Sequence, residues 1–290
     1  MESYKFLFWN INLTNKGKEP KNLLEKQKNI AEVLSWITEN HGINFVLLAE
    51  TQRINSSQLL KILNQSGKGN FKYRNNEEIK RFMAFDNLPN ENVIQSTDRK
   101  GRITSFYYDL NGNKFLLNLV HLRDQFFNTI TTLNSHAQQH ATRINLLEES
   151  TESENTIVVG DFNLNPYDDG MINANAFNAI MSKRVIKRSE SRNFGENEYK
   201  YFYNPSWNLL GKWNGEDILG TYYHDNTGEV NLSYWHVLDQ LLIRGKIIET
   251  FHEEDFKIIY EVPDHKIIKN GIPNKDEYSD HLPIVFTLVL

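Results

Sequence analysis

Several apolar segments of this chain carry a carboxylate, an amide or an imidazole at or near one end. In the clearest case, Gly160-Asp161-Phe162-Asn163 follows the apolar run Ile157-Val158-Val159. Such a run is typical of a buried strand, and an acid and an amide two residues apart project from the same side of it. Sheet edges of this kind are where α/β proteins tend to build sites. The pattern therefore predicts a sheet protein whose polar groups gather at strand ends.

The same pattern recurs along the chain. A single strand that ends in Gly-Asp is often only a turn, because both residues favour turns. Repetition of the pattern weakens that interpretation for the set as a whole. The other segments are Phe8-Trp9-Asn10-Ile11-Asn12, Val46-Leu47-Leu48-Ala49-Glu50, Asn118-Leu119-Val120-His121, Leu238-Asp239-Gln240-Leu241-Leu242 and Ser279-Asp280-His281-Leu282-Pro283.

Composition excludes several classes of protein. The chain has 290 residues, of which 39% are hydrophobic and 12% aromatic, as suits a globular protein with a large core. A formal net charge of -5 argues against a generally basic nucleic-acid binder but leaves room for a local basic surface. The lack of cysteine excludes disulfides, thiolate catalysis and cysteine-bound zinc. No segment reaches membrane-span length and the N-terminus shows no signal-peptide pattern, so we expect a cytoplasmic protein without a membrane partner.

The spacing of apolar residues predicts a mixture of hairpins and strand–helix–strand units. That mixture favours an α/β or α+β architecture with mixed sheets. No linker or repeat divides the sequence, so residues 1–290 are predicted to form a single domain. Helices are expected at residues 21–39 and 126–148, and strands at 4–11, 44–49, 82–85, 103–108, 115–120, 156–160, 237–243 and 283–290.

The stretch at about 194–236 differs from the rest in being rich in tyrosine, tryptophan and glycine. We interpret it as a long, loop-rich excursion of the same domain. Packing is the simplest role for most of its aromatic side chains. One or two of them could face a substrate and stack on it.

Taken in order, these motifs resemble those of the endonuclease/exonuclease/phosphatase superfamily. That superfamily includes pancreatic-type deoxyribonucleases, apurinic/apyrimidinic endonucleases, neutral sphingomyelinases and inositol-polyphosphate 5-phosphatases. The matching motifs run in family order from residue 6 to residue 286, nearly the whole chain. The resemblance implies an α/β (α+β) fold with a two-sheet mixed β-sandwich flanked by helices. It also implies a hydrolase that cleaves phosphodiester bonds with a divalent metal, Mg²⁺ or Mn²⁺.

The resemblance assigns a metal site to Glu50, Asp280 and Asn10. Glu50 matches the principal metal ligand, Asp280 a second carboxylate near the metal, and Asn10 an amide that contacts phosphate or metal-bound water. A hard cation prefers such oxygen ligands. The alternative for Glu50 is an acid that precedes a helix at residues 56–65. Asn12, a candidate substrate-binding residue, stands where the apurinic/apyrimidinic enzymes often have aspartate, so it lowers the negative charge of the metal site.

The catalytic roles implied by the resemblance fall on five residues. Asp161 matches the residue that orients or deprotonates the attacking water, with a turn-forming residue as the alternative. Asn163 matches the amide that steadies the phosphate. His281 matches the imidazole at the phosphate, held by Asp239, although a lone histidine is more often structural. His121 matches a histidine of the deoxyribonucleases and sphingomyelinases, whereas the apurinic/apyrimidinic enzymes carry tyrosine at this position. His121 is a candidate general acid.

The chain departs from the family pattern after Glu50. Relatives often place arginine or lysine two residues later, where this chain has Gln52 followed by Arg53. Arg53 is therefore a candidate phosphate-binding residue, as are Arg102 and Arg123, for which a solvated surface charge is the alternative.

The leading hypothesis is a metal-dependent nuclease whose partner is nucleic acid. The basic run Lys183, Arg184, Lys187, Arg188 and Arg192 supports that substrate weakly, because such runs are usually solvated. The alternative is a phosphoesterase for a phospholipid headgroup or inositol phosphate, which the lack of a polybasic amphipathic helix disfavours. A third hypothesis is a binding module without catalysis, but the expected catalytic positions are all filled by competent residues. The sequence distinguishes neither DNA from RNA nor endo- from exonucleolytic cleavage, and it predicts no oligomeric state.

Overall fold

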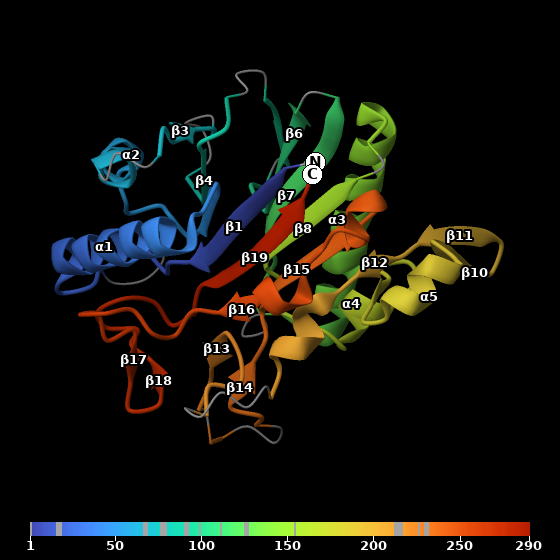
Figure 1. The fold of residues 1–290 in the computed structure, drawn as a ribbon. Coiled ribbons are helices and arrows are strands. Elements are labelled where there is room, and N and C mark those ends of the chain that lie inside the picture. The colour runs from blue at the N-terminus through green and yellow to red at the C-terminus, as the bar shows by residue number, and fades with distance from the viewer. Residues whose placement is uncertain are drawn as a thin grey trace. The chain divides into compact units, whose positions relative to one another are not determined.

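The fold is seen in a computed structural model, whose helices and strands are labelled in Figure 1. The chain forms two compact units. Unit 1 comprises Met1–Glu91, Leu210–His236 and His252–Leu290, and unit 2 comprises Asn92–Leu209 and Val237–Phe251. Each unit is built on one large mixed sheet. The structure describes residues 2–15, 19–65, 69–75, 80–89, 93–98, 100–110, 112–124, 128–153, 155–211, 217–225, 227–228 and 232–290.

The sheet of unit 1 has one parallel strand pair among antiparallel neighbours. β1 and β2 run parallel, and α1 (Leu23–His41) forms the crossover that a parallel pair requires. α2 (Ser56–Gln65) follows β2. The strand order is β16 (Lys257–Ile258), β19 (Ile284–Val289), β1 (Ser3–Asn10), β2 (Phe45–Ala49), β4 (Phe82–Asp86) and β3 (Lys72–Tyr73).

One hydrophobic cluster of unit 1 lies between this sheet and α1. Leu7 and Trp9 alternate along β1 and share a buried cluster with apolar α1 residues such as Ile30 and Leu34. The alternation has the period of a strand and the α1 spacing that of a helix. Phe6 and Phe8, on the other face of β1, are buried as well, so this strand buries both of its faces. α1 ends where Gly42 takes a left-handed conformation with φ 65°, which glycine adopts without steric cost.

The sheet of unit 2 is also mixed, with two parallel pairs, β7–β8 and β12–β9. β7 and β8 run parallel, and α3 (Ile130–Thr151) is the crossover between them. The Thr129 hydroxyl caps α3 by accepting a hydrogen bond from the Thr132 amide at 3.3 Å. The strand order is β5 (Ile94–Thr97), β6 (Ile103–Leu110), β7 (Asn113–His121), β8 (Thr156–Asp161), β15 (Asp239–Arg244), β12 (Phe202–Tyr203) and β9 (Ala179–Ile180).

Smaller elements complete the described residues. Two short helices, α4 (Asp169–Ile172) and α5 (Lys183–Arg188), belong to unit 2. Three hairpins pair outside the large sheets: β10 (Ser191–Phe194) with β11 (Asn197–Lys200), β13 (Tyr222–Tyr223) with β14 (Trp235–His236), and β17 (Ile268–Lys269) with β18 (Ile272–Pro273). The 3₁₀ helices are Pro205–Leu209, Lys246–Ile248 and Glu253–Asp255.

The predicted fold class is confirmed, because both large sheets are mixed and helices connect their parallel strands. Each strand expected from the sequence is present with ends shifted by a few residues. The aromatic-rich excursion is divided between the units at residue 210, and parts of it (212–216, 226 and 229–231) lie outside the described residues. The single domain over residues 1–290 stays a prediction. Within the described residues, no helix combines the length and apolar character needed to cross a membrane.

Candidate active site

In unit 1 the predicted metal-site residues gather at one edge of the sheet. Asn10 ends β1 opposite Ala49, and Glu50 directly follows β2, so the parallel strands deliver both residues to the same edge. The Ser279 hydroxyl donates a 2.6 Å hydrogen bond to the Asn10 carbonyl. This bond ties the segment that carries Asp280 to the same strand end.

Hydrogen bonds to its backbone hold His281 in place within unit 1. Its carbonyl accepts a 2.8 Å hydrogen bond from the Trp9 indole, and its amide donates to the Ser279 hydroxyl at 3.1 Å. The side chain is buried, at 6% exposure, and its ring lies 4.8 Å from the Tyr222 ring. The imidazole is therefore a positioned group of the same sheet edge.

The backbone is strained at two of these positions. Asn12 has φ 46° and Glu50 has φ 56°, in the left-handed region. Asparagine tolerates that region, whereas glutamate does so rarely. The Leu13 amide donates to the Glu50 carbonyl at 2.9 Å, and the Asn12 amide donates to the Asn10 side chain at 3.1 Å. Such strain, about 1–3 kcal/mol per residue, is concentrated at functional sites in proteins.

A buried lysine lies near this edge, and sequence reasoning missed it. Lys26 of α1 is only 4% exposed, and its ammonium donates to the Lys275 carbonyl at 3.0 Å. Burial lowers the pKa of Lys26, while the negative charges of Asp280, Asp276 and Glu50 oppose that shift. The signal in the sequence was a lysine four residues before Ile30, on the face that α1 buries.

Arg53, the substitute expected for the missing phosphate-binding residue, is engaged within unit 1. Its guanidinium lies 3.7 Å from the Glu19 carboxylate and donates to the Asn15 carbonyl at 3.5 Å. Its carbonyl accepts a hydrogen bond from Gln27. These contacts favour a role in holding the loop after β2, and phosphate binding by Arg53 stays a prediction.

In unit 2 three predicted residues form one row across the neighbouring strands β7, β8 and β15. His121 ends β7 opposite Asp161 of β8, and Asp161 in turn lies opposite Asp239 of β15. On the other side, the Arg102 carbonyl accepts a 3.0 Å hydrogen bond from the His121 amide. Residues directly opposite one another in a sheet point to the same face. Strand register therefore brings these side chains together.

Burial and hydrogen bonds fix this row. His121, Asp161 and Asp239 are 6%, 1% and 0% exposed. The His121 Nε2 atom lies 3.5 Å from the Asp161 Oδ2 atom. The other carboxylate oxygen of Asp161 accepts a 2.9 Å hydrogen bond from the backbone amide of Asn163. A carboxylate beside one ring nitrogen orients an imidazole, so Asp161 positions His121, a contact the sequence did not predict.

Two further residues border the row. Asn163 has φ 51° and donates from its side chain to the Leu122 carbonyl at 3.3 Å. Arg102 donates to the His121 and Leu122 carbonyls at 3.1 and 2.8 Å. Arg102 thus holds the end of β7, and its predicted contact with substrate stays a prediction. So does the pairing of Asp239 with His281, which belong to different units.

Gly160 is required by close packing of β8 against β7. A Cβ atom at this position would lie 2.0 Å from the Val120 carbonyl oxygen. Any side chain would push the two strands apart just before His121 and Asp161. The glycine of the Gly160–Asn163 motif therefore sets the approach of the strands on which the row depends.

Solved structures share this fold. An endonuclease/exonuclease/phosphatase family protein from Leptotrichia buccalis matches with a TM-score of 0.60 over 99% of this chain and 100% of that chain, at 13% identity. The chain has the endonuclease/exonuclease/phosphatase fold. TDP2 from D. rerio, solved in complex with a single-strand DNA product, matches with a TM-score of 0.54 over 100% of both chains, at 13% identity.

A third structure, a protein of the same family from Bacteroides thetaiotaomicron, has a TM-score of 0.55 over 99% of this chain and 95% of that chain, at 12% identity. No family model matches the sequence, and no curated protein matches it either. Identities this low establish a shared fold and leave activity open.

The donor set of unit 1 suits a hard cation. Mg²⁺ usually takes one or two carboxylates, together with waters and substrate phosphates. Glu50, Asp280 and the Asn10 amide are donors of that kind, so the residues present fit the metal that this fold family uses. Among the described residues, no three His, Cys, Asp or Glu side chains are grouped so as to hold a metal by themselves. An ion here would therefore rely on oxygens from water and substrate.

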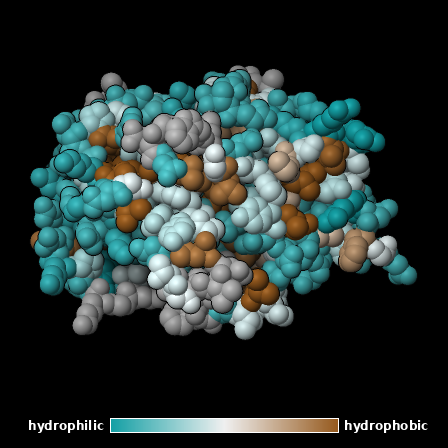
Figure 2. Space-filling view, turned by 90° about the horizontal axis from the view of Figure 1, so that it is seen from below, coloured by the Kyte–Doolittle hydropathy of each residue, from teal (hydrophilic) through white to brown (hydrophobic). Residues whose placement is uncertain are grey.

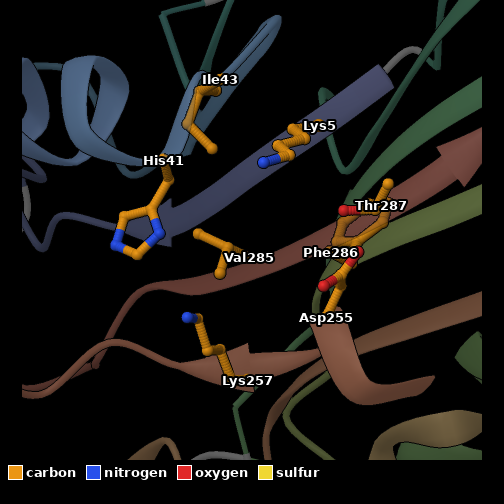
Figure 3. A pocket seen from close by; sticks show the side chains of 8 residues that line it. All are labelled: Lys5, His41, Ile43, Asp255, Lys257, Val285, Phe286 and Thr287. Atoms are coloured by element: carbon orange, nitrogen blue, oxygen red, sulfur yellow. The ribbon is translucent and has the colours of Figure 1, made fainter. Parts of the chain in front are cut away.

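Two hollows among the described residues, one in each unit, lie away from these residues. In unit 1 a pocket of about 70 Å³ opens beside Val285, and Lys5, His41 and Lys257 direct nitrogen atoms toward it (Figure 3). Burial, then the charges of Lys257 and Lys5, lower the pKa of His41. In unit 2 a hollow of about 410 Å³ lies around Arg244. Arg244 ends β15, the strand that begins at Asp239. Neither hollow includes a predicted site residue.

Proposed function

We propose that this chain is a divalent-metal-dependent phosphodiesterase that hydrolyses phosphodiester bonds of nucleic acid. One observation carries the proposal: in each unit predicted residues gather at the sheet edge where a parallel strand pair ends, Asn10 and Glu50 at the ends of β1–β2 and His121 and Asp161 at the ends of β7–β8. This placement supports a site built from carboxylates, amides and imidazoles at strand ends, as expected for the endonuclease/exonuclease/phosphatase fold. The complex of D. rerio TDP2 with single-strand DNA supports the choice of substrate.

The residues of unit 2 handle protons in this proposal. Asp161 accepts the proton of the attacking water. The hydrogen bond that its carboxylate accepts from the backbone amide of Asn163 keeps the carboxylate fixed. Asn163 also steadies the phosphate. His121, oriented by Asp161, donates a proton to the leaving oxygen. A positioned acid or base of this sort contributes about 10²–10⁴-fold to a rate.

The residues of unit 1 bind the phosphate and the cation. Glu50 and Asp280 provide carboxylate ligands, and Asn10 an amide oxygen. A bound divalent cation supplies charge neutralisation at the phosphate oxygens. His281, which its backbone contacts hold in place, binds a phosphate oxygen. Asp239 remains the residue proposed to orient His281.

A lipid substrate is less well supported. Hydrophobic side chains on the face in Figure 2 are scattered among hydrophilic ones. The large exposed hydrophobic residues come from separate elements, such as Leu24 of α1, Ile130 of α3 and Phe194 of β10. Membrane-bound enzymes need a continuous apolar anchor or a basic amphipathic helix.

The decisive experiment incubates the protein with single- and double-stranded DNA and RNA in Mg²⁺ or Mn²⁺, with EDTA as the control. We expect metal-dependent cleavage, and mapping of the product ends shows which side carries the phosphate. Cleavage that persists in EDTA would contradict the metal dependence. An absence of cleavage of every nucleic acid, with turnover of an inositol phosphate, would favour the alternative substrate.

A further inference from the structure

The hairpin β13–β14 is hydrogen-bonded to the segment that carries His281. Tyr222 pairs with His236 within the hairpin and bridges to His281 outside it. The Leu282 amide donates to the Thr221 carbonyl at 2.8 Å. A Cβ atom on Gly220 would lie 2.4 Å from the His236 carbonyl oxygen, so the strands are closely apposed here. The aromatic excursion is therefore anchored beside a predicted phosphate-binding imidazole.

Imidazoles surround one tyrosine ring of this hairpin. The Tyr222 ring lies 4.8 Å from the His281 ring, 6.5 Å from His224 and 6.4 Å from His236, measured between ring centroids. Imidazole nitrogens donate hydrogen bonds to phosphate oxygens and gain positive charge near neutral pH. The surroundings of His281 are thus suited to a polyanion that extends beyond the scissile phosphate.

The same hairpin presents an aromatic ring to solvent. Tyr234 is 42% exposed and has φ 60°, an outlier for a bulky residue. Its ring stacks on Tyr223 at 5.9 Å, and Tyr223 packs edge-on against Trp235 at 5.2 Å. Trp235 is buried with Ile218 and Leu282. Tyr234 is thus an exposed aromatic side chain, held in a strained conformation by the packed Tyr223 and Trp235 side chains. Such a residue is a candidate for ligand contact.

We propose that this hairpin is a nucleotide-binding platform for nucleic acid that is single-stranded beside the scissile bond. In this platform Tyr234 stacks on an unpaired base, and His224 and His236 contact the flanking phosphates. Every base has a stacking face, so the platform is tolerant of sequence, but pairing in a duplex hides those faces. The inference rests on the proposed function and names its substrate class.

The test compares Tyr234→Ser with Tyr234→Phe, and uses Phe194→Ser on β10 as the control for removal of an exposed aromatic. Binding of fluorescein-labelled single-stranded dT12 is measured by anisotropy in EDTA, separately from cleavage. Stacking on an aromatic is worth about 1–3 kcal/mol per base, so Tyr234→Ser should raise Kd roughly 5- to 150-fold. Tyr234→Phe and Phe194→Ser should bind like the parent, with unchanged melting temperatures.

Further comparisons separate the platform from the chemistry. The parent should bind dT12 more tightly than a blunt duplex of equal length, and Tyr234→Ser should hydrolyse methyl 4-nitrophenyl phosphate at the parental rate. His224→Gln with His236→Gln should flatten the salt dependence of dT12 binding. Unchanged dT12 affinity in Tyr234→Ser, or equal affinity of the parent for the duplex, would overturn the platform while leaving the phosphodiesterase intact. Reduced affinity without any hydrolysis by the parent would instead refute the proposed function alone.

Discussion

The two units hold their predicted site residues in different ways. In unit 2, strand register aligns His121, Asp161 and Asp239, and all three are buried. In unit 1, Glu50 follows β2 and Asp280 precedes β19, and both side chains are half-exposed. The backbone of Glu50 is also strained. Buried, register-fixed groups suit proton handling, which needs fixed geometry. Half-exposed carboxylates on loops suit a cation that arrives from solvent with its waters.

This contrast predicts that Asp161→Asn causes the largest decrease in activity. The asparagine side chain cannot accept the proton of water, and its NH₂ group would offer the His121 ring a donor in place of an acceptor. The value of kcat should therefore fall about 10²–10⁴-fold. The measurement is turnover at saturating Mn²⁺. Asp109→Asn, an exposed position on β6 of the same sheet, is the control and should be neutral. Near-parental turnover by Asp161→Asn would mean that the buried row is structural.

Burial in unit 2 should also make the protein sensitive to acid through His140 of α3. Burial, the largest cause, lowers the pKa of His140 to about 4 from 6.5. The unfolded chain therefore takes up a proton between pH 6.5 and 4 that the folded chain does not, and stability is lost as pH falls through that window. The free energy of unfolding should drop by about 3 kcal/mol for this group.

Urea unfolding at pH 7 and pH 4.5 tests this expectation. His140→Leu should lose much of the pH dependence, whereas His252→Gln, at an exposed position, should retain it. If both variants kept the parental dependence, the acid sensitivity would lie in other groups.

Strain in unit 1 should separate stability from function at Glu50. Both Glu50→Ala and Glu50→Gly remove the carboxylate, so both should lose affinity for Mn²⁺. Glycine takes φ 56° without a Cβ penalty, so Glu50→Gly should be more stable than Glu50→Ala by about 1 kcal/mol. Manganese titration and urea unfolding check the two effects. Equal stabilities would argue that the loop relaxes and that Glu50 is held by contacts rather than strain.

Lys26 gives a smaller test of the same edge. Methionine matches its length without its charge, so Lys26→Met removes a positive charge that acts on Asp280 and Glu50. Mn²⁺ should then bind several-fold more tightly, because less positive charge opposes the cation. Lys28→Met, on an exposed position of α1, is the control. Weaker Mn²⁺ binding by Lys26→Met would show that the lysine mainly positions the segment around Lys275.

The sequence could predict the strands and their polar ends because apolar runs and turn residues are local signals. Glu50 and Asp161 were found in this way. The partnership of His121 with Asp161 depends on the register of β7 and β8, which joins residues far apart in the chain. Lys26 was missed because charged residues on a helix are usually solvated. Tyr222 could not be singled out among the aromatic residues of the excursion, because packing is the ordinary role of an aromatic residue. Tertiary contacts decide both cases.

The smallest predicted effect concerns the basic run of unit 2. Lys183 donates to the Phe251 carbonyl at 3.0 Å, and Lys187 pairs with Glu249 at 2.6 Å. Arg192 donates to the Asn178 side chain at 2.8 Å. These contacts hold the run to its own unit, so Arg184 and Arg188 are the better candidates for phosphate contact.

Both arginines are exposed on α5. Arg184→Ser with Arg188→Ser should lower the salt slope of nucleic-acid binding by roughly 0.7–0.9 for each phosphate that the arginines neutralise in the parent. Hydrolysis of a minimal phosphodiester should not change, because the groups of the sheet edges remain. The control is Lys187→Ser, which should affect stability rather than the salt slope. An unchanged slope in the arginine variant would place α5 away from the nucleic acid and leave substrate binding to the sheet edges and the β13–β14 hairpin.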